Sequence, residues 1–367
     1  QYSHTAFTKD NQQNLVHISS FATSDTAATV SSTSTSLQMG LLGALRGGVI
    51  VEGTASALIA SFQGDATIKG ILALTAVASA VVTPLTLYRQ DYSFSVGFSL
   101  SVAAMGLALL NIFGDTLLGT NGAALSKSFA PLLLVSSMIF HGIRLGSFFV
   151  LREIAVPSKH EQIKSFDKTS LLNRLPFSIA VGFLYAFMVT PALFLCRASA
   201  QGVLSFKADK VTALGAALAW LGAVIEAISD LQKFVAKRGK DKSKFFQGPT
   251  TGWFGVSRHP SFFGEILFWL GILVGGTPGL QINILAWIVS LLGFYAIYNI
   301  MIRATVRLEK KQREKYGRQP DYEKWKKKVP QLFPGTSAII FPLSVSAVSA
   351  TVLMKAVQWL VAAAPAA

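Results

Sequence analysis

A basic and aromatic segment runs directly into an apolar one between Gly252 and Gly271, and it contains the residue types best suited to chemistry. Pro260 fits the first turn of a helix, where its missing N–H is not needed, so Arg258 and His259 should lie at the helix start. A helix N-terminus and a guanidinium both favour phosphate, and we therefore expect an anion site there. Glu265 follows about a turn and a half later, where an unpaired carboxylate is costly. The alternative interpretation is a basic membrane anchor followed by an ordinary spanning helix.

Two further groups of polar residues adjoin apolar segments. Glu226, Asp230 and Lys233 recur at helical spacing, so one apolar helix would have an ionisable stripe. Acids in such a stripe usually face a polar cavity, although an internal pair with Lys233 would merely join helices. The second group follows residue 302 and is a cationic helix end, which is also typical of a membrane-surface anchor. It consists of Arg303, Arg307, Lys310 and Lys311, with Glu309 beside them.

The composition places these groups in a membrane protein. Hydrophobic residues make up 51% of the chain and charged residues 14%, and the mean hydropathy is +0.48, whereas a soluble domain of this size carries more charge. The net charge of +15 arises in loops between apolar spans, so positive-inside topology explains it and we predict no nucleic acid partner. The five histidines lack the spacing of metal ligands, and no metal site is predicted.

Apolar runs close to the ~20 residues that cross a bilayer recur from Leu37 onward. They predict an all-α fold, a polytopic integral membrane helical bundle of about eight to nine spans. The expected spans are roughly 37–62, 68–88, 93–117, 128–151, 173–196, 211–232, 260–276, 279–302 and 338–363. The first and last are the weakest, because charged residues interrupt them. The glycines at 275–279 predict close helix packing.

Alternating crossings place the loops 152–172, 233–258 and 303–335 on one side of the membrane. These loops hold most of the Lys and Arg residues, so that side should be the cytosol or the stroma. We expect the membrane to be the endoplasmic reticulum, with a plastid membrane as the alternative. The Ser- and Thr-rich residues 1–36 are predicted to be a disordered tail or a targeting remnant.

Four stretches resemble the broadly distributed branch of the steroid 5-alpha-reductase superfamily. They are E-A-x-x-D-x-Q-K from Glu226, G-W-F-x-x-S-R-H-P-S-F-F-G-E-I-L-F-W-L-G from Gly252, HGIRLGSFFVLRE at 141–153, and RLEKKQREKYGRQPDYEKWKKKVPQLFP at 307–334. The resemblance therefore covers about 141–334. It divides the chain into N-terminal membrane helices (37–140), a reductase-like membrane domain (141–336) and a C-terminal apolar helix (337–367). Two positions depart from the usual pattern, Ser261 in place of Asn and His141 in place of Trp.

The resemblance implies a bundle of about seven or more membrane helices that holds NADPH between its C-terminal helices. The implied reaction is reduction of a carbon-carbon double bond conjugated to a carbonyl, in a hydrophobic lipid or steroid-like substrate. Glu265 is the expected catalytic acid. The implied cofactor-binding residues are Glu226, Asp230, Lys237, Arg238, Trp253, Arg258, His259, Ser261, Arg303 and Arg307.

Two other functions are compatible with the same residues. Isoprenylcysteine carboxyl methyltransferases share Arg-His-Pro followed by aromatic residues and Gly, but they bind S-adenosylmethionine. They typically have a Glu-Glu pair in the late helix, where this chain has the single Glu309. A non-catalytic membrane subunit on the same scaffold is the third possibility, and Ser261 is the residue that favours it. We favour the reductase.

Overall fold

The computed structural model describes residues 49–119, 129–165, 167, 170–237 and 245–335. Every regular element within those residues is a helix, so the predicted all-α class is confirmed for the described chain. The chain divides into a first unit that ends at Ala60 and a second that begins at Ser61. In the first unit the described residues belong to α3 (Val49–Gln63), and all elements considered below lie in the second.

Seven of the described helices are long and apolar enough to cross a membrane, which makes this a multi-pass membrane protein. They are α4 (Thr67–Tyr88), α5 (Val96–Leu118), α6 (Ala130–Ala155), α8 (Leu171–Ala200), α9 (Phe206–Lys237), α10 (Pro260–Leu280) and α11 (Ile284–Tyr316). They match the seven expected spans from 68–88 to 279–302 one for one. Of the two remaining expected spans, 37–62 is described only from residue 49 on, within α3, and 338–363 lies outside the described residues, so the count of eight to nine is not confirmed.

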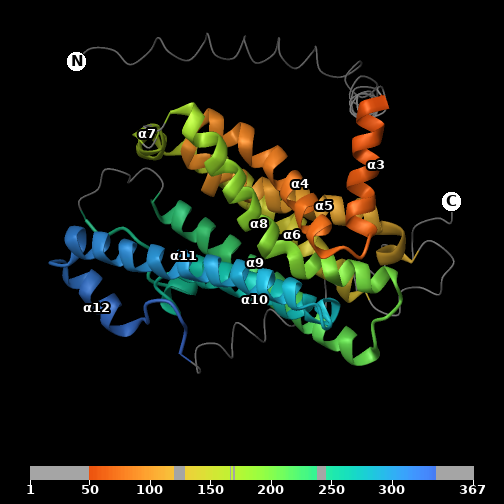
Figure 1. Ribbon diagram of the computed structural model, residues 1–367. Helices are drawn as coiled ribbons and strands as arrows, with labels where there is room; N and C mark the ends of the chain where they lie inside the picture. Colours follow the sequence, from red (N-terminus) through yellow and green to blue (C-terminus); the bar gives the residue numbers. More distant parts are fainter. Residues whose placement is uncertain (1–48, 120–128, 166, 168–169, 238–244, 336–367) are drawn as a thin grey trace, which may run out of the picture. The chain divides into compact units, whose positions relative to one another are not determined.

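Shorter helices lie between the spans. They are η1 (Gln90–Phe94), α7 (Pro157–Ser165), η2 (Gly252–Gly255) and α12 (Pro320–Lys328). Figure 1 shows the α8–α9 connection and the α10–α11 turn toward one end of this unit, and α7 and α12 toward the other. That arrangement agrees with the predicted grouping of the basic segments at one end.

Two predicted boundaries were wrong. The glycines at 275–279 pack closely as predicted, with Gly276 against Pro191 and Gly279 against Leu195 of α8, but α10 continues through them to Leu280 instead of ending at 276. The chain turns instead at Gln281, which adopts a φ of 45°. The basic segment after residue 302 is not a loop, since α11 continues to Tyr316.

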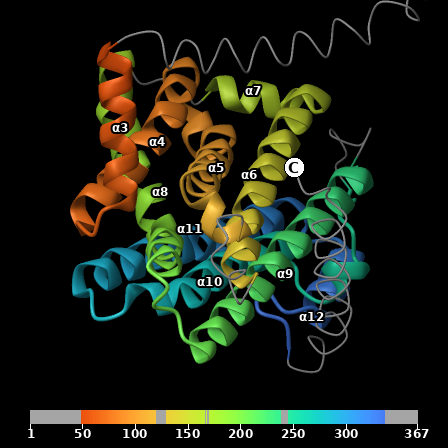
Figure 2. The same ribbon diagram turned by 90° about the vertical axis from the view of Figure 1, so that its right-hand side faces the viewer.

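The most extensive contact between two of the described helices is that of α9 and α10, which lie side by side in both views (Figures 1 and 2). Glycines seven residues apart on each helix, Gly215 and Gly222 on α9 and Gly264 and Gly271 on α10, line the contact. A Cβ atom on Gly222 would lie 2.4 Å from the backbone nitrogen of Phe268, so only glycine permits this approach. Small residues at such interfaces let membrane helices approach closely.

Packing of the other helices builds a wall around this pair. α6 packs against α5 and α9, and α8 packs against α4, α10 and α11. Polar residues on α6 therefore face the acidic stripe of α9, and apolar residues on α8 face α10 and α11. These contacts set the positions of the side chains in the candidate site.

We predict that Gly222→Ala destabilises the protein by about 1–3 kcal/mol, because the added methyl group overpacks the α9–α10 contact. Gly114 in α5 is the matched control, since a Cβ atom there would meet nothing within 4 Å. Gly114→Ala should leave stability unchanged or raise it by up to about 1 kcal/mol, the helix propensity gain. Thermal unfolding of both variants in detergent measures the difference. Equal behaviour of the two variants would show that α9 and α10 do not meet at Gly222.

Candidate functional site

A cavity of about 1410 Å³ lies among η1, α5, α6, α7, α8, α9, α10 and α11. This volume exceeds the about 300–1,000 Å³ of ordinary small-molecule pockets. One part of its lining is apolar and aromatic and includes Phe94, Phe98, Phe177, Leu184, Met188 and Ile300. The other part is charged and contains both acids and cations. The cavity therefore has room and surface for a large ligand with an anionic part, or for two ligands.

Six of the residues predicted from the sequence line this cavity. They are Glu226, Asp230 and Lys237 on α9, Ser261 and Glu265 on α10, and Arg307 on α11. Lys233 lines it as well, so the stripe on α9 faces the cavity from residue 226 to residue 237. At about 1.5 Å per residue this stripe extends over roughly 16 Å of the helix. The acids lie at its deeper end and the lysines at the end of the helix.

Four other predicted residues, Trp253, Arg258, His259 and Arg303, are not among those that line the cavity. Arg303 is exposed on α11, one turn before Arg307. Arg238 lies outside the described residues.

The acids of α9 are held by an arginine from α6. Arg144 Nη2 donates to Glu226 Oε2 at 2.7 Å, and Arg144 Nη1 donates to Asp230 Oδ2 at 3.1 Å. The sequence had offered Lys233 as the partner of these acids, and the structure gives Arg144 that place. Removing Arg144 would leave the buried carboxylate of Glu226 and the partly buried one of Asp230 without their contacting cation, which is costly in an apolar environment.

His141 lies between the two buried glutamates. Its Nδ1 is 3.3 Å from Glu226 Oε2, and its Nε2 is 3.5 Å from Glu265 Oε2. The ring is fully buried and stacks on Phe268 with 4.0 Å between the ring centroids. The other oxygen of Glu265, Oε1, accepts a hydrogen bond from Trp269 Nε1 at 2.7 Å. The spacing of histidines along the chain gave no sign of this cluster.

These three side chains are also of the types that ligate metals. One donor atom from each of His141, Glu226 and Glu265 lies within 4.8 Å of the others. However, the two ring nitrogens face different carboxylates, and a single ion binds only one nitrogen of an imidazole. Arg144 already provides a positive charge next to Glu226. The arrangement suits a proton between the ring and a carboxylate better than a metal ion.

Cations gather at the other end of the polar lining. They are Arg152 on α6, Lys159 on α7, Lys233 and Lys237 on α9, and Arg307 on α11. Among the described residues no carboxylate lies within 4 Å of Arg152, Lys233, Lys237 or Arg307. Burial, and then the neighbouring Arg152, Lys311 and Lys237, lower the pKa of Lys159. A cluster in which cations outnumber acids attracts anionic ligands.

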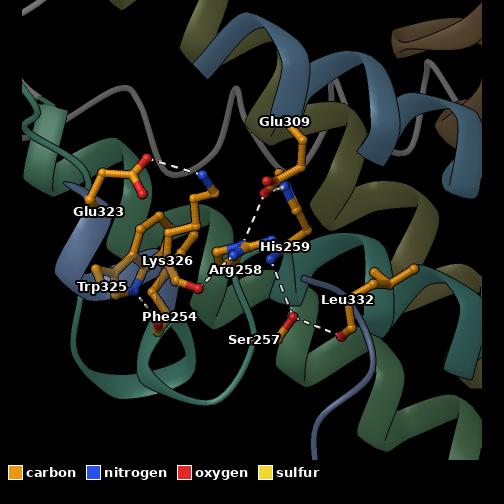
Figure 3. A network of polar contacts seen from close by, with 9 residues as sticks. All are labelled: Phe254, Ser257, Arg258, His259, Glu309, Glu323, Trp325, Lys326 and Leu332. Carbon is orange, nitrogen blue, oxygen red and sulfur yellow. Dashed lines mark hydrogen bonds and ion pairs between the residues drawn. The ribbon is translucent and has the colours of Figure 1, made fainter. Parts of the chain in front are cut away.

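Arg258 and His259 are part of a separate polar network (Figure 3). Arg258 Nε donates to Glu309 Oε1 at 3.1 Å, and Arg258 Nη1 donates to the carbonyl of Lys326 at 2.8 Å. His259 Nε2 lies 2.8 Å from the same Glu309 oxygen. Burial of the imidazole lowers the pKa of His259, and the hydrogen bond to Glu309 only partly offsets this effect. Because its partner is a carboxylate oxygen, Nε2 is the donor in this contact.

This network corrects the expectation of a ligand anion at the start of α10, because the anion at Arg258 is the protein's own Glu309. Further bonds extend the network: Ser257 Oγ donates to the carbonyl of Leu332 at 2.7 Å, and Trp325 Nε1 donates to the carbonyl of Phe254 at 2.8 Å. The segment before α10 is thus joined to the end of α11 and to α12 (Figure 3). We call this set of contacts the α10 latch.

The sequence reasoning missed His141, Arg144, Arg152 and Lys159 as site residues. A signal for two of them was present, because Arg144 and Arg152 are eight residues apart in an apolar run and share a helix face. An arginine inside a membrane span is itself a pointer to a buried polar partner.

Comparison with known protein families gives a match over most of the chain. The family described as "Protein of unknown function (DUF1295)" matches residues 100–329 of the 367 residues. No curated protein and no solved structure matches the chain. The matched range contains all the described polar residues of the cavity except Gln90, Asp91 and Ser93.

We predict that Glu309→Ala destabilises the protein by at least about 2 kcal/mol, since it leaves Arg258 without its carboxylate and His259 without its acceptor. The loss should stay below the about 3–5 kcal/mol of a fully buried pair, because 14% of the Glu309 side chain is exposed. Glu323→Ala removes the more exposed pair with Lys326 and should cost no more than about 1 kcal/mol. Thermal unfolding of both variants checks the prediction. Equal losses would mean that the α10 latch does not hold the loop.

Proposed function

This chain belongs to the DUF1295 family, whose function is unknown, and we propose that it is a membrane-embedded NADPH-dependent reductase of a hydrophobic enone. The observation that carries the proposal is the cavity of about 1410 Å³, which combines a cationic end, a pair of buried glutamates and an apolar wall. Each part answers one requirement of such a reaction.

The cationic end fits the phosphates of the cofactor. Arg152, Lys233, Lys237 and Arg307 approach it from three helices, and none of them has a carboxylate partner within 4 Å among the described residues. Arginine and lysine are the side chains that bind phosphate groups. Arg144 is not available for this task, since Glu226 and Asp230 occupy its guanidinium. When bound, NADPH supplies the hydride.

The apolar wall fits the substrate. Phe98, Leu184, Met188, Ile297 and Ile300 come from α5, α8 and α11 and offer no hydrogen-bonding side-chain group. A hydrophobic molecule gains from contact with such a surface, and it would bring its reacting double bond to the part of the cavity where Glu265 lies. Glu265 would provide the proton that completes the reduction.

The membrane orientation is part of the same proposal. Lys233 and Lys237 belong to the last turns of α9 and Arg307 to the last third of α11, and these helix ends lie toward the side that carries α7 and α12 (Figure 1). Positive-inside topology would place that end in the cytosol or the stroma, where NADPH is available to it.

We predict that NADPH raises the thermal unfolding temperature of the purified protein in detergent, and that S-adenosylmethionine does not. A ligand that binds only the folded state stabilises it by about 2.7 kcal/mol when present at 100 times its Kd. Stabilisation by S-adenosylmethionine alone would favour the methyltransferase alternative. No stabilisation by either ligand would favour the non-catalytic subunit.

We further predict that Arg307→Ala weakens NADPH binding about tenfold, whereas Arg303→Ala leaves it nearly unchanged. Both residues are exposed arginines on α11, one turn apart, but only Arg307 lines the cavity. A charge-assisted hydrogen bond contributes about 1.5 kcal/mol or more, and ~1.4 kcal/mol is one decade of affinity. Titration of each variant with NADPH measures the difference. Equal, small effects would assign both arginines to membrane topology alone.

A further inference from the structure

The buried cluster holds three acids and one strong cation, and one of the acids does not contact that cation. Glu226, Asp230 and Glu265 face a single strong cation, Arg144, which contacts the first two. Among the described residues no Lys or Arg nitrogen lies within 4 Å of Glu265, and the polar side chains next to it are His141, Trp269 and the carboxylate of Glu226. Glu265 is buried, and an unpaired buried carboxylate is strongly disfavoured. A proton is the simplest way to neutralise it.

The position of His141 shows where that proton would be held. Neither ring nitrogen has a hydrogen-bond partner among the described residues, although the ring is fully buried and each nitrogen faces a carboxylate oxygen. Buried polar atoms without partners call for an explanation, and hydrogen bonds of reacting groups are often long until a substrate is bound. The Trp269 N–H occupies Glu265 Oε1, so Oε2 is the oxygen left for His141.

The partners of the ring also determine its tautomer. Arg144 donates to Glu226 Oε2 at 2.7 Å, and a guanidinium at this distance favours the ionised carboxylate. As an acceptor, this oxygen would favour the proton of His141 on Nδ1. The other nitrogen, Nε2, is then an acceptor that faces Glu265 Oε2. The partner of one ring nitrogen commonly sets the state of the other in this way.

We propose that Glu265 and His141 form a proton store, in which Glu265 rests as a neutral acid whose Oε2–H faces His141 Nε2, while Glu226 and Arg144 fix the His141 tautomer. This role rests on the proposed reductase function. Glu265 lines the cavity and is the catalytic residue, whereas His141 does not line it and is a positioning residue. Glu226 then belongs to this store rather than to the cofactor site predicted from the sequence.

The store supplies the second half of the reduction. After the hydride reaches the β-carbon, the electron pair of the former double bond takes the proton from Glu265 Oε2 and forms the new carbon-hydrogen bond at the α-carbon. Glu265 becomes a carboxylate and is reprotonated from water in the cavity that it lines. An ionised carboxylate could not act as the acid in this step, which is the physical reason for holding Glu265 neutral.

Infrared spectroscopy tests the store without any turnover. In a detergent that lacks ester groups, the wild-type protein near neutral pH should show the carbonyl band of a neutral carboxylic acid. Glu265→Gln should abolish this band, His141→Gln should shift it, and Glu314→Gln, at an exposed position, should leave it unchanged. Absence of the band in the wild type, or its survival in Glu265→Gln, would refute the store whether or not the protein binds NADPH.

Measurements of turnover and of metal binding test the proton store independently of the infrared spectra. His141→Gln should keep the stabilisation by NADPH but lower turnover about 100-fold, in the range of general acid catalysis, with a larger solvent deuterium isotope effect. Unchanged turnover and isotope effect would reduce His141 to a packing residue.

If Zn²⁺ alone abolished the band and stabilised the wild type but not His141→Gln, the cluster would be a metal site instead. The infrared pattern with no effect of NADPH would sustain the store and refute the reductase. Should His141→Gln fail to fold, the wild-type, Glu265→Gln and Glu314→Gln spectra still decide the proposal.

Discussion

The close backbone contact between α9 and α10 is the constraint on which the rest of the site depends. Gly264 meets the backbone of Gly222 and the Cβ atom of Glu226, so any larger side chain would separate the helices there. Glu226 lies one turn after Gly222, and Glu265 directly follows Gly264. The contact between the two glycines therefore brings both carboxylates into one buried cluster. Two acids forced together in an apolar environment need a counter-charge or a proton. The polar face of α6, with His141 and Arg144, meets that need.

The segment from Gly252 to Gly271 has two roles, one structural and one in the cavity, and its sequence does not show where the first ends and the second begins. Its first half is structural, because Ser257, Arg258 and His259 join the start of α10 to Glu309 on α11 and to the chain after α12. Its second half lines the cavity through Ser261, Phe262 and Glu265. The α10 latch therefore fixes the first turn of the helix that carries the acid. A change in the latch would reach the site through the position of α10 rather than through lost contact with a ligand.

Hydropathy and helical spacing predicted the features that are determined by residues close together in the chain. The seven described spans and the polar stripe at Glu226 and Asp230 followed from runs and periods in the sequence. The partners of that stripe did not, because Arg144 lies 82 and 86 positions before the two acids that it contacts. Glu309 was noted beside its cationic neighbours, yet its pairing with Arg258, 51 positions away, depends on how α11 and the loop pack. Which charged residues pair across helices depends on how the helices pack. The residue types alone therefore did not determine which cation contacts each acid.

The order of charges along α9 gives the cavity a direction. Acids lie at 226 and 230, and lysines follow at 233 and 237 toward the end of the helix. An ion pair between these groups would have cancelled both charges, but Arg144 takes the acids and leaves the lysines without a carboxylate within 4 Å among the described residues. An anionic group is thus attracted to the outer end, where the lysines lie, and disfavoured at the inner end, where the acids lie. A ligand with a phosphate-bearing part and an uncharged reactive part, such as a reduced nicotinamide cofactor, would enter in one orientation only, with its reactive part toward Glu265.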